Sequence, residues 1–319
     1  MKAIVCSKYG SPDVLQLEEV EKPATADDLV LVRVRAASVN PADWYGVAGP
    51  LIVRPSTGFL KPRNDRTGID FAGTVEAVGK DITHVRPGDE VFGAKSGALA
   101  EYVSVRDAVV PKPANISFEE AAAVPVAAIT ALQGLRDKGQ LQAGQRVLIN
   151  GASGGVGTFA VQIAKALGAE VTAVCSTRNV ELVRSLGADH VIDYTREDFT
   201  RSDRRYDLLL DVAGSKQWSA LRRVLTPEAR VVIVGAQKRR VLGPLGHIVR
   251  LRLASLRGSQ KAVFFIAKTN RADMEILREL LETGKVKPVV DRRYDLADTA
   301  DAFRYLGEGH ARGKIVVTL

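Results

Sequence analysis

A glycine-rich turn, NGASGGVG, occupies residues 150–157 between the apolar stretch RVLIN and a segment with helical apolar spacing. Its glycines let a pyrophosphate approach the backbone, and Gly157 allows the helix to pack closely on the strand. A helix N-terminus at this point offers unpaired N–H donors to an anion. The context of strand, turn and helix therefore predicts a dinucleotide site. The predicted contacts are Ser153, Gly154, Gly155 and Val156.

The next apolar strand, EVTAVC, ends about 20 residues beyond this turn, where an NAD site usually carries an acid that bonds the ribose 2′-hydroxyl. Here the tip reads Cys175-Ser176-Thr177-Arg178, with no acid in it. Two hydroxyls and a guanidinium attract a 2′-phosphate, which a carboxylate would repel. The tip therefore predicts NADPH as the cofactor, bound by Ser176, Thr177 and Arg178.

The elements around these residues predict an α/β protein. Strands and helices alternate through the middle third, which is typical of a parallel, doubly wound sheet. The first third alternates apolar and polar positions, as in VLVRVRAASV, and predicts an antiparallel β unit. A Ser117-x-x-Glu120 capping box opens a helical segment that Pro125 should divide. From about Thr269 the pattern runs helix, strand, helix, strand.

Composition restricts the class of protein. A chain of 319 residues usually forms more than one domain. Two cysteines make no disulfide framework, so a reducing cytoplasm is the expected compartment. No apolar run reaches the roughly 18–20 residues that span a bilayer. The N-terminus MKAIVCSKYG does not have the pattern of a signal peptide.

The net charge of +8 comes from one stretch: Glu228 to Asp273 encloses ten Lys and Arg residues and no acid. This stretch is either a solvated surface or an electropositive entrance for anionic substrates, cofactor phosphates or a membrane surface. Peripheral membrane contact through 238–261 is one hypothesis. The stretch lacks interleaved aromatic residues and any RNA-binding motif, so we expect no nucleic-acid partner.

Several segments together resemble the medium-chain dehydrogenase/reductase superfamily, and within it the zinc-free quinone oxidoreductase branch. They are AASVNPADW, GIDFAGTVEAVG, RPGDEVFG, the glycine turn, LGADHVIDY and FRYLGEGHARGKIVVTL. The resemblance covers essentially the whole chain. It implies a GroES-like catalytic domain, residues 1–124 and 268–319, and a Rossmann NADPH-binding domain, residues 125–267. It also implies an active site between the two domains, and we expect a homodimer.

The zinc-binding branch of the superfamily uses a cysteine after the first long strand and a Gly-His-Glu motif. The corresponding stretches here read SVNPAD (38–43) and Gly68-Ile69-Asp70, without the cysteine or the histidine. The four histidines are scattered without metal-ligand spacing. We therefore expect no metal site, and we interpret Asp70 as a hydrogen-bonded structural acid.

Without a metal, side-chain donors must stabilise the charge that hydride transfer leaves on the acceptor oxygen. The resemblance implies that Asn40, Tyr45 and Thr130 face the nicotinamide, with Tyr45 as proton donor or enolate anchor and Trp44 as a packing residue. It further implies that Gly235, Phe265 and Ile266 lie around the nicotinamide. Tyr194 and Lys314 match positions that reach the adenosine phosphates.

The predicted function is therefore NADPH-dependent reduction of quinones or α,β-unsaturated carbonyls. An enoyl-thioester reductase of acyl-CoA or acyl-carrier-protein substrates is close in chemistry and stays open. A non-catalytic NADPH-binding scaffold is the alternative from another class. Residues 50–66 and 236–261 are longer or more basic than a minimal quinone reductase needs, so the substrate itself stays open.

Overall fold

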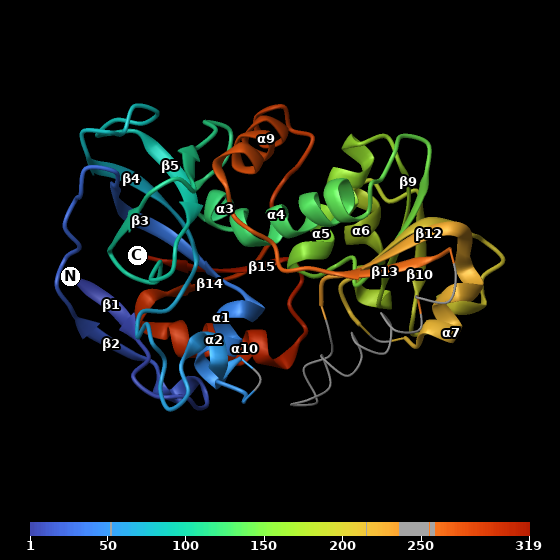
Figure 1. The fold of residues 1–319 in the computed structure, drawn as a ribbon, viewed down its shortest axis with the longest axis horizontal. Helices are drawn as coiled ribbons and strands as arrows, with labels where there is room; N and C mark the ends of the chain where they lie inside the picture. The colour runs from blue at the N-terminus through green and yellow to red at the C-terminus, as the bar shows by residue number, and fades with distance from the viewer. Residues whose placement is uncertain (52, 215, 236–254, 256–258) are drawn as a thin grey trace. The chain divides into compact units, whose positions relative to one another are not determined.

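The computed structural model describes residues 1–51, 53–214, 216–235, 255 and 259–319 (Figure 1). The chain divides into two compact units. Unit 1 comprises Met1–Ile129, Thr269–Gly284 and Pro288–Leu319, and unit 2 comprises Thr130–Lys268 and Lys285–Lys287. Most of the predicted membrane-contact stretch, 238–261, lies outside the described residues. No helix in the described part of the chain combines the length and apolarity that crossing a bilayer requires.

Unit 1 is built on a seven-stranded sheet in the order β14-β15-β3-β4-β5-β7, with β6 paired to β3. All its pairs are antiparallel except β14 with β15, so the predicted antiparallel unit is largely confirmed. In β3 the apolar Val32 and Val34 are buried, whereas the intervening Arg33 is exposed, as a period of two requires. The strands are β1 (Lys2–Val5) and β2 (Gln16–Glu19), which form a separate pair, and β3 (Val30–Val39), β4 (Asp70–Val78), β5 (Glu90–Ala94), β6 (Tyr102–Val105), β7 (Val109–Pro111), β14 (Val290–Asp295) and β15 (Lys314–Thr318).

Capping residues and proline set the helix boundaries of unit 1. Ser117 and Glu120 form the predicted capping box, with Ser117 N to Glu120 Oε2 at 2.8 Å and Glu120 N to Ser117 Oγ at 3.2 Å. Pro125 begins a new helix, as predicted, because it lacks the N–H that would continue the previous one. The helices are η1 (Pro12–Val14), α1 (Pro41–Ala48), α2 (Arg54–Thr57), α3 (Phe118–Ala122), α9 (Arg271–Glu282), η6 (Leu296–Asp298) and α10 (Thr299–Glu308), and α4 (Pro125–Gln133) runs from unit 1 into unit 2.

Unit 2 contains a six-stranded sheet in the order β10-β9-β8-β11-β12-β13, and every pair in it is parallel. The chain proceeds outward from β8 to β10 and then returns to β11, so the direction of winding changes between β8 and β11. The predicted doubly wound parallel sheet is confirmed. Its strands are β8 (Arg146–Asn150), β9 (Glu170–Cys175), β10 (His190–Asp193), β11 (Tyr206–Asp211), β12 (Leu225–Ile233) and β13 (Lys261–Phe264).

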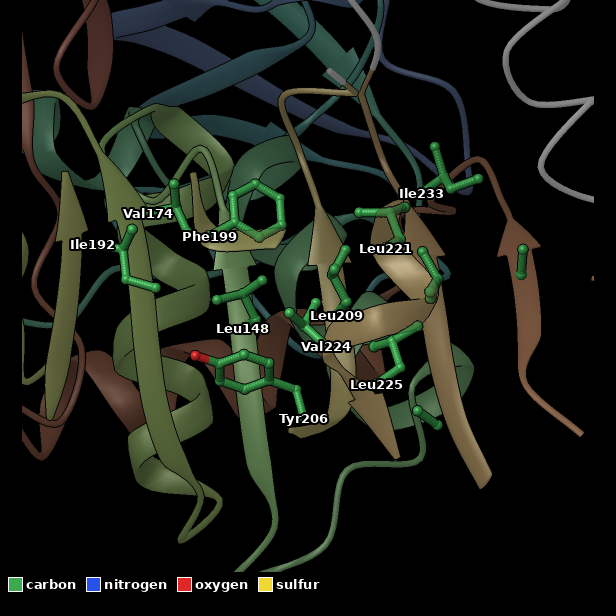
Figure 2. Close-up of a cluster of buried hydrophobic side chains, with 13 residues drawn as sticks. Leu148, Val174, Ile192, Phe199, Tyr206, Leu209, Leu221, Val224, Leu225 and Ile233 are labelled. Atoms are coloured by element: carbon green, nitrogen blue, oxygen red, sulfur yellow. The ribbon is translucent and has the colours of Figure 1, made fainter. Parts of the chain in front are cut away.

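The core of unit 2 holds these strands in place. Figure 2 shows Leu148, Val174 and Ile233, from three different strands, in one buried cluster with Phe199 and Leu221 from the connecting helices. All five side chains are at most 2% exposed, so the strand ends next to them have little freedom to shift. The helices are η2 (Gly134–Lys138), α5 (Gly155–Ala166), η3 (Thr177–Asn179), α6 (Val180–Ser185), η4 (Phe199–Arg201), α7 (Trp218–Leu221) and η5 (Arg222–Val224).

Candidate functional site

The glycine turn of unit 2 connects β8 to α5 and leaves the helix N-terminus open. Gly154 is the N-cap residue, in extended conformation, and no side chain caps the helix. A Cβ built on Gly154 meets only Gly151 O, at 3.7 Å, whereas a Cβ on Gly157 would lie 2.2 Å from that same oxygen. Gly157 is therefore required for packing, and the space before Gly154 is open. An anion can approach the first N–H groups of α5.

This turn lies where the winding of the sheet reverses, because β8 and β11 are neighbours. Asn150 Nδ2, at the end of β8, donates to Asp211 Oδ1 at 2.8 Å, and Gly214 N donates to the same oxygen at 2.9 Å. Gly235, after β12, also belongs here: a Cβ on it would lie 2.0 Å from Val212 O. Ligands of doubly wound sheets bind at this edge. Asn150 and Asp211 were missed because their pairing depends on strand order.

The end of β9 is tied to the glycine turn by Asn179, a residue that sequence reasoning also missed. Asn179 is 4% exposed, and its Nδ2 donates to Ser153 Oγ at 2.9 Å and to Ser176 Oγ at 3.2 Å. Two predicted cofactor contacts from different strand ends are therefore brought together. The signal available in the sequence was the position of Asn179, three residues after Ser176, where a short polar side chain can reach back to the strand end.

The tip of β9 carries no acid of its own, as the sequence shows, but an acid at the end of the neighbouring strand β10 lies beside it. Because β10 pairs in parallel with β9, Asp193 stands beside Cys175. Thr177 Oγ1 donates to Asp193 Oδ2 at 2.5 Å, and the Thr195 backbone N–H donates to Oδ1 at 3.0 Å. The bond from Thr177 is the main reason that the pKa of Asp193 is lowered, so the carboxylate is charged at neutral pH. While this bond exists, the Thr177 proton is not available to a phosphate.

Arg178 and Tyr194 are the other two residues predicted near the adenosine. Arg178 follows Thr177 on the exposed side of η3. Tyr194 follows β10, with its backbone N–H on Cys175 O at 3.0 Å and its side chain 61% exposed. Both side chains therefore extend into solvent from the same strand ends that carry Ser176 and Asp193.

A second part of unit 2 joins α4 to the segment after β13. Gln133 Nε2 donates to Lys268 O at 2.8 Å, and Lys268 N donates to Gln133 Oε1 at 3.1 Å. Thr130 lies one turn earlier on α4, while Phe265 packs its ring close to Gly134 at the helix end. Ile266, also predicted near the nicotinamide, is 80% exposed. The structure thus brings Thr130 and the 265–268 segment to one region of unit 2.

Unit 1 contains a buried polar cluster made of Ser38, Asn40, Asp43, Asp70 and Lys314. Asp70 is its centre and is 0% exposed. Its Oδ2 accepts from Ser38 Oγ and Asn40 Nδ2, each at 3.0 Å, and its Oδ1 accepts from the Val126 backbone N–H at 3.0 Å, near the start of α4. The interpretation of Asp70 as a hydrogen-bonded structural acid is confirmed.

Lys314 is placed differently from the prediction that it reaches the adenosine phosphates. It is 3% exposed, and its Nζ lies 3.3 Å from Asp70 Oδ2, 3.4 Å from Val39 O and in hydrogen-bond contact with Asn40 Oδ1. These three acceptors match the three donors of an ammonium. The prediction was wrong because the position of Lys314 on β15, beside the end of β3, directs it into the core of unit 1.

The Asn40 side chain is also engaged internally. It is 2% exposed, its Nδ2 donates to Asp43 Oδ2 at 3.2 Å as well as to Asp70, and its Oδ1 accepts from Lys314. Its backbone N–H donates to Asp43 Oδ2 at 2.8 Å, which closes a turn at the start of α1. Both Nδ2 hydrogens are therefore used within the protein, and the buried side chain offers a substrate no free donor. Asn40 is therefore a positioning residue for α1, which corrects its predicted catalytic role.

Asp43 has an unusual titration. Burial is the main reason, and the neighbouring charge of Asp70 the second, that the pKa of Asp43 is raised to about 7. Between about pH 4 and pH 7 the folded protein keeps a proton that the unfolded chain, with a carboxyl pKa of about 3.9, has released. The unfolded state is then favoured by deprotonation, so this group lowers stability as pH rises through that window.

The helix α1 carries Tyr45 one turn beyond this cluster. Tyr45 is half-buried, and burial raises the pKa of its phenol, so it stays protonated at neutral pH. Its ring makes an edge-to-face contact with Trp44, with centroids 5.4 Å apart. Trp44 packs against the core cluster that includes Phe303, which confirms its predicted packing role.

In the described part of the chain, no group of three or more His, Cys, Asp and Glu side chains is arranged to hold a metal ion. Asp70, which follows Ile69 at the position of the zinc motif, is instead paired with the ammonium of Lys314.

Comparisons with known proteins agree with this architecture. Residues 26–114 match the alcohol dehydrogenase GroES-like domain family, and residues 186–317 match the zinc-binding dehydrogenase family. The 2-methylene-furan-3-one reductase of Solanum lycopersicum is 36% identical over 99% of this chain and 79% of its own. The Escherichia coli quinone oxidoreductase complexed with NADPH has a TM-score of 0.86 at 26% identity, with all of both chains covered. The CurK enoyl reductase has a TM-score of 0.85 at 28% identity, covering 99% of this chain and 98% of its own.

These matches extend over both units, and the strand order, the glycine turn and the β-rich unit are all present in the structure. The resemblance that the sequence motifs indicated is thereby confirmed, and with it the GroES-like and Rossmann-like fold classes. The chain belongs to the quinone oxidoreductase-like branch of the medium-chain dehydrogenase/reductase superfamily.

Proposed function

We propose that this protein is an NADPH-dependent reductase of quinones or α,β-unsaturated carbonyls. The observation that carries the proposal is the open, uncapped N-terminus of α5 at the edge where the parallel sheet reverses its winding. Two similar proteins support it: one is named for the reduction of an enone, and the other is a quinone oxidoreductase complexed with NADPH. In this proposal unit 1 is the catalytic domain and unit 2 the cofactor domain.

The residues present fit the cofactor. The space before Gly154 admits a pyrophosphate, which Ser153, Gly154, Gly155 and Val156 would hold. Ser176, Arg178 and Tyr194 would bind the 2′-phosphate, with Thr177 joining them once its bond to Asp193 is exchanged. Thr130, Gly235, Phe265 and Ile266 are the proposed nicotinamide contacts. When bound, NADPH supplies the hydride that reduces the substrate double bond.

Tyr45 is the proposed proton donor. Reduction of an enone leaves negative charge on the carbonyl oxygen, and a phenol within hydrogen-bond reach can stabilise that oxygen and return a proton, directly or through water. The raised pKa of Tyr45 keeps the proton on the phenol until it is needed. The buried polar cluster supports this role, because it fixes the start of α1 one turn before Tyr45.

We propose that the reaction needs no metal. Lys314 already pairs with Asp70, and Ile69 offers no ligand atom beside it. Activity should survive exhaustive dialysis against a chelator, and elemental analysis should find much less than one zinc per active chain. Loss of activity on chelation, with recovery on adding zinc, would contradict the proposal.

The decisive experiment measures NADPH consumption with a panel of quinones, enones and enoyl-CoA thioesters, with NADH as the control cofactor. Turnover of a quinone or an enone with a preference for NADPH supports the proposed function. NADPH binding without turnover of any substrate in the panel would instead favour a non-catalytic scaffold.

Enoyl-thioester reduction is the second candidate, because the CurK enoyl reductase covers nearly the whole chain. The same hydride and proton transfers would serve an enoyl thioester. This candidate would be preferred if the enoyl-CoA arm of the panel gave a kcat/KM above that of every free enone.

Assembly and location are further proposals. The edge strand β13 has one paired side in the described sheet, so its other side can pair with a second copy of the chain. We propose a homodimer, to be tested by light scattering with size-exclusion chromatography.

We also propose a cytoplasmic location, because both cysteines are free and a reducing compartment is the default for such a chain. Fractionation of the source cells tests it.

A further inference from the structure

Unit 1 contains a cavity of about 250 Å³ beside the helix that carries Tyr45. One wall is the face of α1 formed by Ala42, Asp43 and Gly46. The loop that follows α2 also lines the cavity, and Arg63 and Arg66 are among its lining residues. Gly46, which lines the cavity, follows the proposed proton donor Tyr45 directly on α1, and Tyr45 itself is not among the lining residues.

The two arginines give this cavity a positive wall. In the described residues neither guanidinium has a carboxylate oxygen within 4.0 Å. Arg66 Nη2 makes a 3.4 Å contact with the backbone oxygen of Glu21, which leaves most of the guanidinium donors available. The hydrogen bond of Arg63 is made by its backbone N–H, which donates to Thr57 O at 2.7 Å. Asp65 lies between them in the chain and is exposed, outside the residues that line the cavity.

Neutral hydrogen-bond donors complete the lining. Asn64 Nδ2 donates to Ser96 Oγ at 2.8 Å, which holds these two side chains together on the cavity wall. The one acid in the lining, Asp43, already accepts two hydrogen bonds from Asn40. Its carboxylate therefore faces donors of its own cluster, and Arg63 and Arg66 are the other charged residues of the lining.

The size of the cavity restricts its ligand. A volume of about 250 Å³ accommodates a carboxylate with a short carbon chain. Guanidinium forks bind carboxylates in a bidentate manner, which adds orientation to attraction.

We propose that this cavity is a substrate subsite for a carboxylate, so that the preferred substrates are enones or quinones with an acidic side chain. This inference rests on the proposed reductase function and adds the class of substrate to it. Arg63 and Arg66 would hold the carboxylate while the conjugated carbonyl is placed toward Tyr45.

The test compares two substrates that differ only in charge: a vinyl ketone with a carboxylate at the far end of a four-carbon chain, and its methyl ester. The methylene groups insulate the double bond, so both compounds have the same reactivity. We expect the wild-type protein to have a kcat/KM for the acid that is about tenfold to a hundredfold above that for the ester, the effect of one or two charge-assisted hydrogen bonds.

The variants Arg63→Gln and Arg66→Gln should each reduce this acid-to-ester ratio by about tenfold. The matched control is Lys61→Gln, which removes the same charge from an exposed position of the same loop that does not line the cavity. That control should keep the wild-type ratio. A ratio near one in the wild-type protein, or an equal fall in Lys61→Gln, would overturn the subsite.

A binding measurement separates this inference from the proposed function. Calorimetry with the saturated keto acid and its methyl ester should show tighter binding of the acid by wild-type protein and a loss of that difference in Arg66→Gln. If neither vinyl ketone is reduced but the acid still binds more tightly, the reductase function fails and with it the substrate role of the cavity, while carboxylate binding by the cavity stands. If both are reduced equally and neither ligand is preferred in calorimetry, the subsite fails and the function stands.

Discussion

The buried polar cluster of unit 1 and the polar strand ends of unit 2 use similar side chains in opposite surroundings. In the cluster, Lys314 and Asp70 are at most 3% exposed, and each makes at least three polar contacts within the protein. At the ends of β9 and β10, Thr177 and Arg178 are exposed to solvent. A desolvated charge must keep its partners, whereas a solvated group can exchange them for a ligand.

Because of this difference, the cluster of unit 1 is suited to fixing the backbone, and the strand ends of unit 2 are suited to binding a ligand. The cluster joins the end of β3, the start of α1, β4 and β15, so it fixes backbone geometry beside Tyr45. The strand ends of unit 2 keep polar groups that a cofactor can take over, although Thr177 is bonded to Asp193 in the structure. Substitutions in the first region should therefore reduce stability, and those in the second should change cofactor preference.

The largest effect is expected for Lys314→Met, which leaves the carboxylate of Asp70 buried without its cation. Removing one partner of a buried pair typically costs about 3–5 kcal/mol. The free energy of unfolding in urea would measure it. Lys80→Met is the matched control, because Lys80 pairs with Asp27 at 2.7 Å with both side chains mostly exposed, and should cost less than about 1 kcal/mol. Similar losses in both variants would remove the contrast between buried and exposed pairs.

Tyr45→Phe tests whether Tyr45, which lies beside the buried polar cluster, is a catalytic group. Loss of one donor to a developing oxyanion typically costs about 2.7–4 kcal/mol, a factor of roughly 10²–10³ in turnover. We expect this loss with enones, unchanged affinity for NADPH and a smaller loss with quinones, whose reduced form is a more stable anion. Steady-state kinetics and a cofactor titration measure these quantities. Full turnover of the best enone by Tyr45→Phe would make Tyr45 a packing residue.

Arg178→Ala tests whether the exposed end of β9 binds the 2′-phosphate of NADPH. Charge-assisted hydrogen bonds to a 2′-phosphate contribute about 1.5–3 kcal/mol each, so the variant should raise the KM for NADPH by about tenfold or more. The KM for NADH should barely change, because NADH lacks the phosphate, and NADH thus serves as the control. A parallel rise for both cofactors would place Arg178 outside the 2′-phosphate site.

Asp193→Asn should have the smallest effect and the opposite sign. Removing a solvated carboxylate from beside Thr177 relieves its repulsion of the 2′-phosphate, and exposure to solvent keeps this effect small. We expect the ratio of kcat/KM for NADPH over NADH to rise by about threefold to tenfold. The effect should shrink at high salt, because screening weakens interactions between exposed charges. No change in the ratio at low salt would show that Asp193 does not face the phosphate.

Much of the fold could be predicted because its signals are local. The capping box of Ser117 and Glu120, the break at Pro125 and the glycine turn depend on neighbours within a few residues in the chain. The alternation of strands and helices was sufficient to predict a parallel, doubly wound sheet. The family resemblance then placed the β-rich unit and the predicted site residues on this frame.

The sequence by itself determined the class of fold, the glycine turn between strand and helix, and the absence of the zinc motif's histidine at Ile69. Only the tertiary structure decided what Lys314 and Asp193 contact: Lys314 was expected near the adenosine phosphates, and Asp193 was not among the expected site residues. Asp193 reaches Thr177 through the pairing of β10 with β9, and Lys314 reaches Asp70 across 244 positions of the chain. Contacts of this kind follow from strand register and burial, which depend on the packing of distant segments. Residue type and spacing along the chain do not specify them.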